Sequence, residues 1–195
     1  MAVAIRSLGT LSEQQLRDAE ERLGFPLPED YRSWLAATNG GDPELAVTLP
    51  DRDFLWEHRA YGLRPDAPLE DVVYCYSYFR DRFTPDYLPV VDVSGGILAL
   101  KVKGERHGSV WFWSDDDPWA SDEDTAADTE RLLYFCGGSW EAFLERLEVP
   151  EPITDAELEE FVRRHNVRLE IGPAADVEPE AEHEPRDGGE SGSSA

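Results

Sequence analysis

The stretch from residue 88 to residue 113 restricts the fold of this chain more than any other part of its sequence. It contains three runs rich in Val, Ile, Leu, Phe and Trp, at residues 88–93, 97–103 and 109–113, and the two intervening segments contain glycine. Runs of this kind, bounded by short glycine turns, are typical of β-strands that pair with their neighbours in sequence. We therefore predict a three-stranded antiparallel meander.

The middle run also predicts how the sheet is covered. Leu98, Leu100 and Val102 share one face, whereas Lys101 and Lys103 lie on the other. Because successive strand residues point to opposite faces, this pattern favours a sheet covered by helices on one side. The third run is apolar on both faces, so we expect both of its faces to be at least partly covered.

Helices are predicted where capping residues precede apolar residues at helical spacing. Ser12 and Gln15 match a capping box, and Gly24 provides a stop for this first helix. Pro28 suits the first turn of a second helix, which Asn39 would end. Near residue 140 the helical spacing recurs at Trp140, Phe143, Leu144 and Leu147.

Other segments give weaker signals. Residues 69–82 fit either a helical face or a strand, and the Asp and Pro residues at their ends favour the helix. Apolar fragments at 45–49 and 54–56 predict one or two short strands between loops. After an acidic loop at 115–130, residues 131–136 predict a fourth strand.

The combined pattern predicts an α+β fold, with a central antiparallel sheet packed by helices, over residues 1–149. A second capping box at 154–157 predicts an additional C-terminal helix within residues 150–171. Residues 172–195 are mostly Glu, Ala, Pro, Gly and Ser, with almost no large apolar side chain. We expect this last segment to be a disordered acidic tail.

Acidic residues dominate the charge of the chain, with 42 Asp and Glu against 18 Lys and Arg and a formal net charge of −24. Residues 170–195 hold eight acidic residues and one arginine, which leaves −17 for residues 1–169. Such a field repels nucleic acid and anionic membranes and steers a basic partner toward the chain. We expect a basic protein partner, with acidity that serves solubility alone as the alternative.

The sequence predicts a cytoplasmic protein. The apolar run at the start is short and contains Arg6, unlike a secretory signal, and no run approaches the roughly 20 apolar residues of a membrane-spanning helix. The two cysteines, Cys75 and Cys136, lie in apolar stretches. They predict reduced core thiols, and a disulfide is the less favoured alternative.

The usual sequence signatures of catalysis do not occur. The chain contains no dinucleotide-binding glycine motif, Walker loop, His-Glu-x-x-His or Gly-x-Ser-x-Gly. An acidic cluster at 115–124 is the best candidate cation site. An EF-hand loop starting at Asp115 would, however, place Ala120 and Ala126 where Gly and Glu are required. We expect no catalytic residue, metal or cofactor, and a divalent-ion-dependent hydrolase is the least favoured alternative.

Carboxylates and tryptophans are interleaved in two predicted loop regions, 42–57 and 115–119. Tryptophan is enriched where proteins bury surface against one another, and carboxylates complement a basic partner. The predicted partner-binding residues are Asp42, Glu44, Asp51, Asp53, Trp56, Glu57, Asp115, Asp116 and Trp119.

Several motifs, taken in order over about residues 12–149, resemble the SUKH superfamily. They are Leu27-Pro28 with Trp34-Leu35 and Asn39-Gly40-Gly41, then Leu88-Pro89-Val90 with Gly95-Gly96, then Gly108 with Val110-Trp111-Phe112-Trp113, and finally Ser139-Trp140 with Phe143-Leu144. The chain differs in having Trp140 where the family usually has phenylalanine, and in an acidic insertion before Arg131.

This resemblance implies the same α+β architecture and no catalytic site. Most bacterial members of the superfamily look like immunity proteins, which bind and neutralise toxins that are often nucleases or deaminases. The resemblance therefore implies a bacterial immunity protein that occludes a basic nuclease or another nucleic-acid-modifying toxin. Fungal relatives look like cytosolic regulators, so a regulatory or scaffolding module that binds another protein is the alternative.

Overall fold

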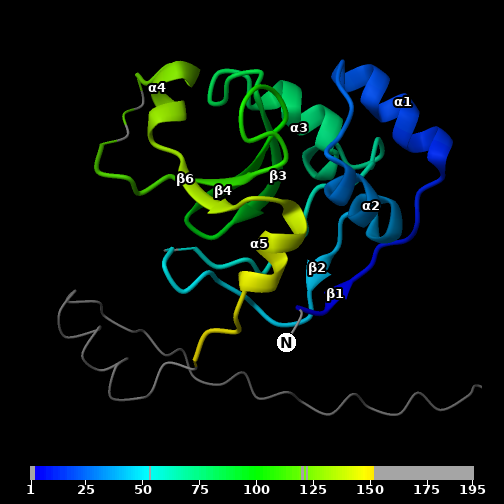
Figure 1. Cartoon of the computed structure of the whole chain (residues 1–195), viewed down its shortest axis with the longest axis horizontal. Coiled ribbons are helices and arrows are strands. Elements are labelled where there is room, and N and C mark those ends of the chain that lie inside the picture. The colour runs from blue at the N-terminus through cyan, green and yellow to red at the C-terminus, as the bar shows by residue number, and fades with distance from the viewer. Residues whose placement is uncertain (1–2, 53, 120, 122, 152–195) are drawn as a thin grey trace, which may run out of the picture. The chain divides into compact units, whose positions relative to one another are not determined.

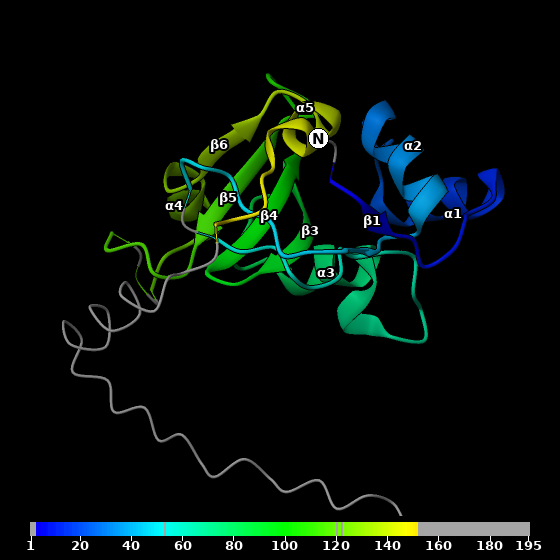
Figure 2. The ribbon, with the colours of Figure 1, turned by 90° about the horizontal axis from the view of Figure 1, so that it is seen from below.

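The computed structural model describes residues 3–52, 54–119, 121 and 123–151. Its main sheet has four antiparallel strands in the order β3-β4-β5-β6, which Figure 1 shows within the whole chain and Figure 2 shows with every strand labelled. The strands are Tyr87–Val93 (β3), Gly96–Lys101 (β4), Val110–Ser114 (β5) and Tyr134–Gly137 (β6). The predicted meander is confirmed, with its middle strand ending at Lys101 instead of Lys103.

Gly96 allows β4 and β5 to start their pairing at the tight turn after β3. Its φ angle is 146°, and a Cβ atom at this position would lie 1.9 Å from the carbonyl oxygen of Trp113. Only glycine tolerates both this backbone conformation and this close approach.

Both faces of the sheet are covered. One face packs into the main core, where Leu98 and Leu100 are fully buried. On the opposite face Ile97 and Ala99 are also buried, in a second apolar cluster. The Lys101 ammonium group donates to a tyrosine hydroxyl of β3 at 3.1 Å and to a glutamate at 3.2 Å. The prediction of a sheet covered on one side is therefore wrong, because lysine here borders an apolar cluster and is held by hydrogen bonds.

The helices are α1 (Glu13–Leu23), α2 (Glu29–Thr38), α3 (Val72–Tyr78), α4 (Ala126–Arg131) and α5 (Trp140–Arg146), with a 3-10 turn at Pro68–Glu70. Ser12 and Gln15 form the predicted capping box of α1, and both Gly24 and Asn39 have the left-handed conformation that ends a helix. The ambiguous segment 69–82 is helical, although α3 is shorter than the segment.

The segment before β6 differs from the prediction. Residues 126–131 form α4, so the predicted loop to residue 130 is wrong. The predicted fourth strand is confirmed as β6, although it begins at Tyr134 instead of Arg131. The Thr125 side chain accepts a hydrogen bond from the backbone N–H of Asp128, and the Asp128 carboxylate accepts one from the N–H of Thr125. This acidic residue therefore caps a helix, which a count of loop charges does not reveal.

The helices pack around the sheet by a few direct contacts. Helix α3 contacts β3, α5 contacts both β6 and α2, and α1 contacts α2 and α3. Figure 2 shows α1 and α2 as neighbours beyond the β3 side of the sheet. The α+β fold with an antiparallel sheet packed by helices is thus confirmed.

Short strand-like segments extend the β3 edge of the sheet. The antiparallel bridges are Leu55 with Ser94, Val47 with Trp56, and Thr48 with Glu148. The predicted short strands at 45–49 and 54–56 correspond to these bridges. A separate two-stranded sheet pairs β1 (Ile5–Arg6) with β2 (Asp42–Pro43).

Cys75 and Cys136 are free and buried, as predicted. Within the described residues no helix is long and apolar enough to cross a membrane. The predicted helix at 150–171, beyond its first two residues, and the predicted tail at 172–195 lie outside the described residues.

Asp30, in the first turn of α2, links two helices that are distant in sequence. Its carboxylate accepts hydrogen bonds from the backbone N–H of Trp140 at 2.6 Å and of Glu141 at 3.3 Å, at the start of α5. The first N–H groups of a helix have no partner within the helix, and a negative charge there is favourable. A carboxylate from α2 therefore helps to place α5.

Replacing this carboxylate tests its role. We expect Asp30→Ala to lower the free energy of unfolding by about 1–2 kcal/mol, the usual cost of losing a helix cap. Urea denaturation followed by tryptophan fluorescence measures this loss. The matched control is Glu29→Ala, which removes an exposed neighbouring carboxylate that makes no hydrogen bond within the described residues. Equal losses in the two variants would show that Asp30 acts only through its charge near α2.

Candidate functional site

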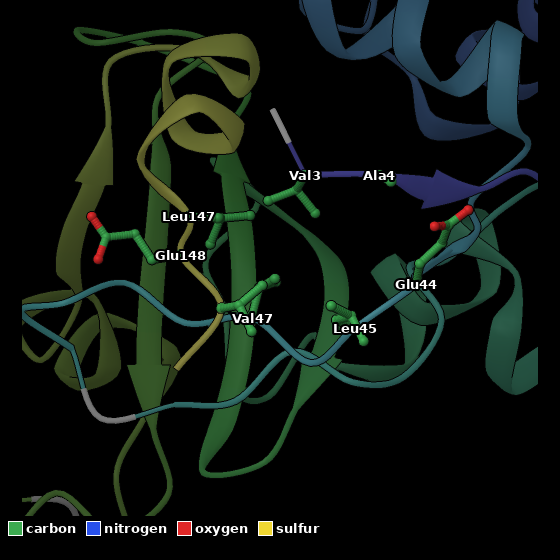
Figure 3. A pocket seen from close by; sticks show the side chains of 8 residues that line it. Val3, Ala4, Glu44, Leu45, Val47, Leu147 and Glu148 are labelled. Atoms are coloured by element: carbon green, nitrogen blue, oxygen red, sulfur yellow. The ribbon is translucent and has the colours of Figure 1, made fainter. Parts of the chain in front are cut away.

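An apolar groove opens beside the small β1–β2 sheet, with a volume of about 540 Å³ (Figure 3). Its lining comes from three segments that are far apart in sequence: Val3 and Ala4; Glu44, Leu45 and Val47; and Leu147, Glu148 and Val149. We call this the apolar groove. Six of its eight lining residues are aliphatic, and the other two are glutamates.

Backbone pairing holds the three segments of the apolar groove together. The N–H of Glu44 donates to the carbonyl of Ala4 at 2.9 Å. Thr48 and Glu148 exchange two backbone hydrogen bonds, each of 2.9 Å. Leu147 ends α5 with extended dihedral angles, so the chain leaves the helix in the direction of this pairing.

A second hollow lies across the same strand pair, with a volume of about 370 Å³. It is lined by Thr48, Phe54, Leu55, Ser94, Gly95, Asp116 and Pro150. We call it the turn hollow, because Ser94 and Gly95 form the turn between β3 and β4. The apolar groove uses Val47 and Glu148, whereas the turn hollow uses the adjacent Thr48 and Pro150. The two depressions therefore lie against the same pair of extended segments.

Four carboxylates gather near the β3–β4 turn, and we call them the turn carboxylates: Glu57, Asp92, Asp115 and Asp116. The Ser94 hydroxyl donates to Glu57 at 2.9 Å, and the N–H of Asp115 donates to the carbonyl of Gly95 at 3.1 Å. Partial burial is the main reason that the pKa of Asp92 is raised; His58 opposes this shift and the negative charge of Asp115 adds to it.

The structure places four of the nine predicted binding residues at one of the two depressions or beside the β3–β4 turn. Glu44 lines the apolar groove and Asp116 the turn hollow, while Glu57 and Asp115 flank the turn. Asp53 lies outside the described residues.

Two of the other predicted carboxylates are ion-paired with arginines of the same chain. Asp42 pairs with Arg6, whose hydrogen bond lowers the pKa of this carboxyl. Asp51 lies 3.2 Å from Arg146 and 3.4 Å from Arg52. Their charges are partly neutralised within the domain, so they contribute less to an acidic surface than the sequence suggests.

The prediction that Trp56 binds a partner is wrong. Its side chain is 0% exposed, it stacks on Phe143, and its indole N–H donates to the carbonyl of His58 at 2.7 Å. The sequence predicts a loop region around Trp56. The backbone bridge between Trp56 and Val47 instead directs the indole side chain into the core.

Trp119, by contrast, is 80% exposed. Its backbone N–H donates to Asp117, and the same carboxylate accepts a hydrogen bond from the hydroxyl of Tyr134 at 2.6 Å. Asp117 is buried, so this member of the acidic cluster anchors the loop to β6. Trp119 lines neither depression.

Sequence reasoning missed several residues of the surface. Glu148 and Val149 follow directly after α5, and no local pattern marks them as part of a site. Asp92 alternates with buried Val91 and Val93 on β3, and that alternation could have identified an outward carboxylate on a strand.

Neither thiol is suited to nucleophilic catalysis, because burial raises the pKa of both Cys75 and Cys136 to about 12. Among the described residues, which do not include Asp122, no group of three or more His, Cys, Asp or Glu side chains is arranged to hold a metal ion.

A sequence model of the SMI1 / KNR4 family (SUKH-1) matches residues 10–146. This interval includes every helix and strand from α1 to α5, and it leaves out β1 and the end of the apolar groove at Leu147–Val149. No match is found among curated proteins.

The charges of Asp115 and His58, which act on the carboxyl group of Asp92, give a prediction for pH titration. We expect the pKa of Asp92, followed by carbon-13 NMR of its carboxyl carbon, to lie above the ordinary value of about 3.9. Asp115→Asn should lower this pKa, because it removes a nearby negative charge that disfavours ionisation. His58→Gln should raise it, because it removes a positive charge that favours ionisation. The distant substitution Asp81→Asn serves as the control. If neither Asp115→Asn nor His58→Gln changed the pKa of Asp92, the placement of these two side chains near Asp92 would be contradicted.

Proposed function

Because the chain belongs to the SMI1 / KNR4 family (SUKH-1), we propose that it is a cytoplasmic immunity protein that neutralises a toxin by binding it. The toxin is a basic nuclease or another nucleic-acid-modifying enzyme, and the chain acts by covering the toxin's nucleic-acid-binding surface. This role involves no reaction catalysed by the chain itself.

The observation that carries the proposal is the group of turn carboxylates, one of which, Asp116, lines the turn hollow. Glu57, Asp115 and Asp116 are exposed, and apolar lining residues of the turn hollow lie beside Asp116. Interfaces combine a desolvated apolar centre with a polar rim, and opposite charges speed the encounter of two proteins. A toxin that binds nucleic acid needs basic side chains for the phosphates, which makes its active surface complementary to these carboxylates.

The rest of the chain supports a binding role. The formal charge of residues 1–169 is −17, so the acidity is not confined to the C-terminal segment. The only two thiols are buried and protonated, and no metal-binding group occurs among the described residues. These features favour protein recognition over catalysis.

Co-expression with the product of the adjacent gene tests the proposal. We expect the chain to relieve toxicity of that product in a bacterial host and to copurify with it. Absence of rescue, together with a stable complex with an ordinary cellular protein, would instead indicate a regulatory or scaffolding module.

The electrostatic part of the proposal predicts a rate effect. The triple variant Glu57→Gln, Asp115→Asn and Asp116→Asn should slow association with the toxin about tenfold at low salt, and the difference should shrink at high salt. Stopped-flow fluorescence measures this rate. The control triple variant Glu21→Gln, Glu105→Gln and Glu141→Gln removes the same charge from exposed positions elsewhere. If both variants slowed association equally, net charge and not the turn carboxylates would explain the steering.

A further inference from the structure

Two of the most exposed aliphatic side chains of the domain line the same depression. Leu45 is 64% exposed and Val149 is 56% exposed, and both lie at the apolar groove. Between them are Val47 and Leu147, which are almost fully buried. Large apolar side chains exposed around a shared depression are typical of a surface that another molecule covers.

The charges at the apolar groove indicate the chemistry of that molecule. Glu44 and Glu148 are exposed lining residues, and within the described part of the chain neither forms an ion pair. In Figure 3 the carboxylate of Glu148 points away from the labelled apolar side chains, so its charge lies at the edge of the groove. The nearby Arg6 is paired with Asp42. An apolar depression with two exposed carboxylates at its edge is complementary to an apolar side chain flanked by basic ones.

Most of the apolar groove lies outside the part of the chain that matches the family. Five of its eight lining residues, Val3, Ala4, Leu147, Glu148 and Val149, fall before residue 10 or after residue 146. The matched domain alone would therefore lack two of the three segments of the groove. A site added at the margins of a shared fold is suited to selecting one partner among those that related domains bind.

We propose that the apolar groove receives one large aliphatic or aromatic side chain of the toxin, which is flanked by Lys or Arg residues that pair with Glu44 and Glu148. This specificity site rests on the proposed function, and it adds an apolar anchor to the electrostatic attraction of the turn carboxylates. The anchor contacts Leu45, Val47 and Val149, and it determines which basic toxin is bound.

A peptide probe tests the chemistry of the apolar groove without the toxin. The probe is Gly-Arg-Leu-Phe-Leu-Arg-Gly, added to the full-length chain and followed by proton–nitrogen NMR. We expect the largest shifts at the backbone amides of Leu45, Val47 and Val149. Two control peptides keep the length: one replaces the three apolar residues with Ser-Asn-Ser, and the other replaces both arginines with glutamates. Both should bind much more weakly.

Substitutions in the apolar groove sharpen the test. Leu45→Asp should weaken binding of the probe about tenfold, the effect of losing one buried leucine contact. The matched control is Leu69→Asp, at a leucine that is 68% exposed and lies in the 3-10 turn before α3. The double variant Glu44→Gln and Glu148→Gln should weaken binding roughly two- to fivefold, as expected for exposed ion pairs. All four substituted positions are exposed, and an unchanged melting temperature establishes that each variant is folded.

Three outcomes would overturn the inference: shifts that map outside the apolar groove, equal effects of Leu45→Asp and Leu69→Asp, or equal binding of the polar control peptide. The toxin separates this inference from the proposed function. If Leu45→Asp rescued the host as well as the unchanged chain does, the immunity role would stand and the apolar anchor would be wrong. If the probe bound as expected while no toxin was neutralised, the groove chemistry would stand and the immunity role would be wrong.

Discussion

The packing of Trp140 joins the parts of the domain on which the surface depends. Its ring lies 5.2 Å from Tyr31 and 4.9 Å from Trp34 on α2, and 6.2 Å from Trp56 in the segment that extends the sheet, measured between ring centroids. Trp56 in turn pairs through its backbone with Val47, which lines the apolar groove. Large aromatic side chains bury much apolar area and pack in specific geometries, so this cluster fixes the distance between helices and the extended sheet edge. The shape of the groove is thus a consequence of core packing.

The acidic residues of the domain divide into groups with different physical roles. Asp30, Asp117 and Asp128 accept backbone or hydroxyl hydrogen bonds and hold α5, the loop before α4, and α4 in place. Asp42 and Asp51 are paired with arginines. The other exposed carboxylates include a group near the β3–β4 turn, two beside the apolar groove, and further ones elsewhere on the domain, such as Glu21 and Glu105. A strongly negative total charge therefore overstates the acidic surface that a partner can contact, although it still contributes a long-range field.

The interaction that we propose separates into two physical components. The turn carboxylates act at a distance and favour any basic partner, whereas the apolar groove acts only at contact and depends on shape. All four turn carboxylates lie within the interval that matches the family model. The second component depends on residues at both margins of the domain, and Thr48 and Glu148 hold one of these margins in place. Selectivity between similar basic toxins would then come mainly from the groove.

The sequence by itself determined the strands of the meander, the caps of α1 and α2, and the class of fold. These features depend on alternation with a period of two and on capping partners three residues apart, so nearby residues suffice to specify them. The same local patterns began the fourth strand at residue 131 and placed Trp56 at a binding surface. The Thr125–Asp128 capping box is itself a local pattern within the acidic segment, whereas the bridge from Trp56 to Val47 has no local signature. Only the tertiary structure decided which carboxylates are exposed together and where the grooves lie. The physical reason is that burial and ion pairing arise from contacts between distant segments, such as Thr48 with Glu148 and Asp51 with Arg146, and these contacts leave no local pattern in the sequence.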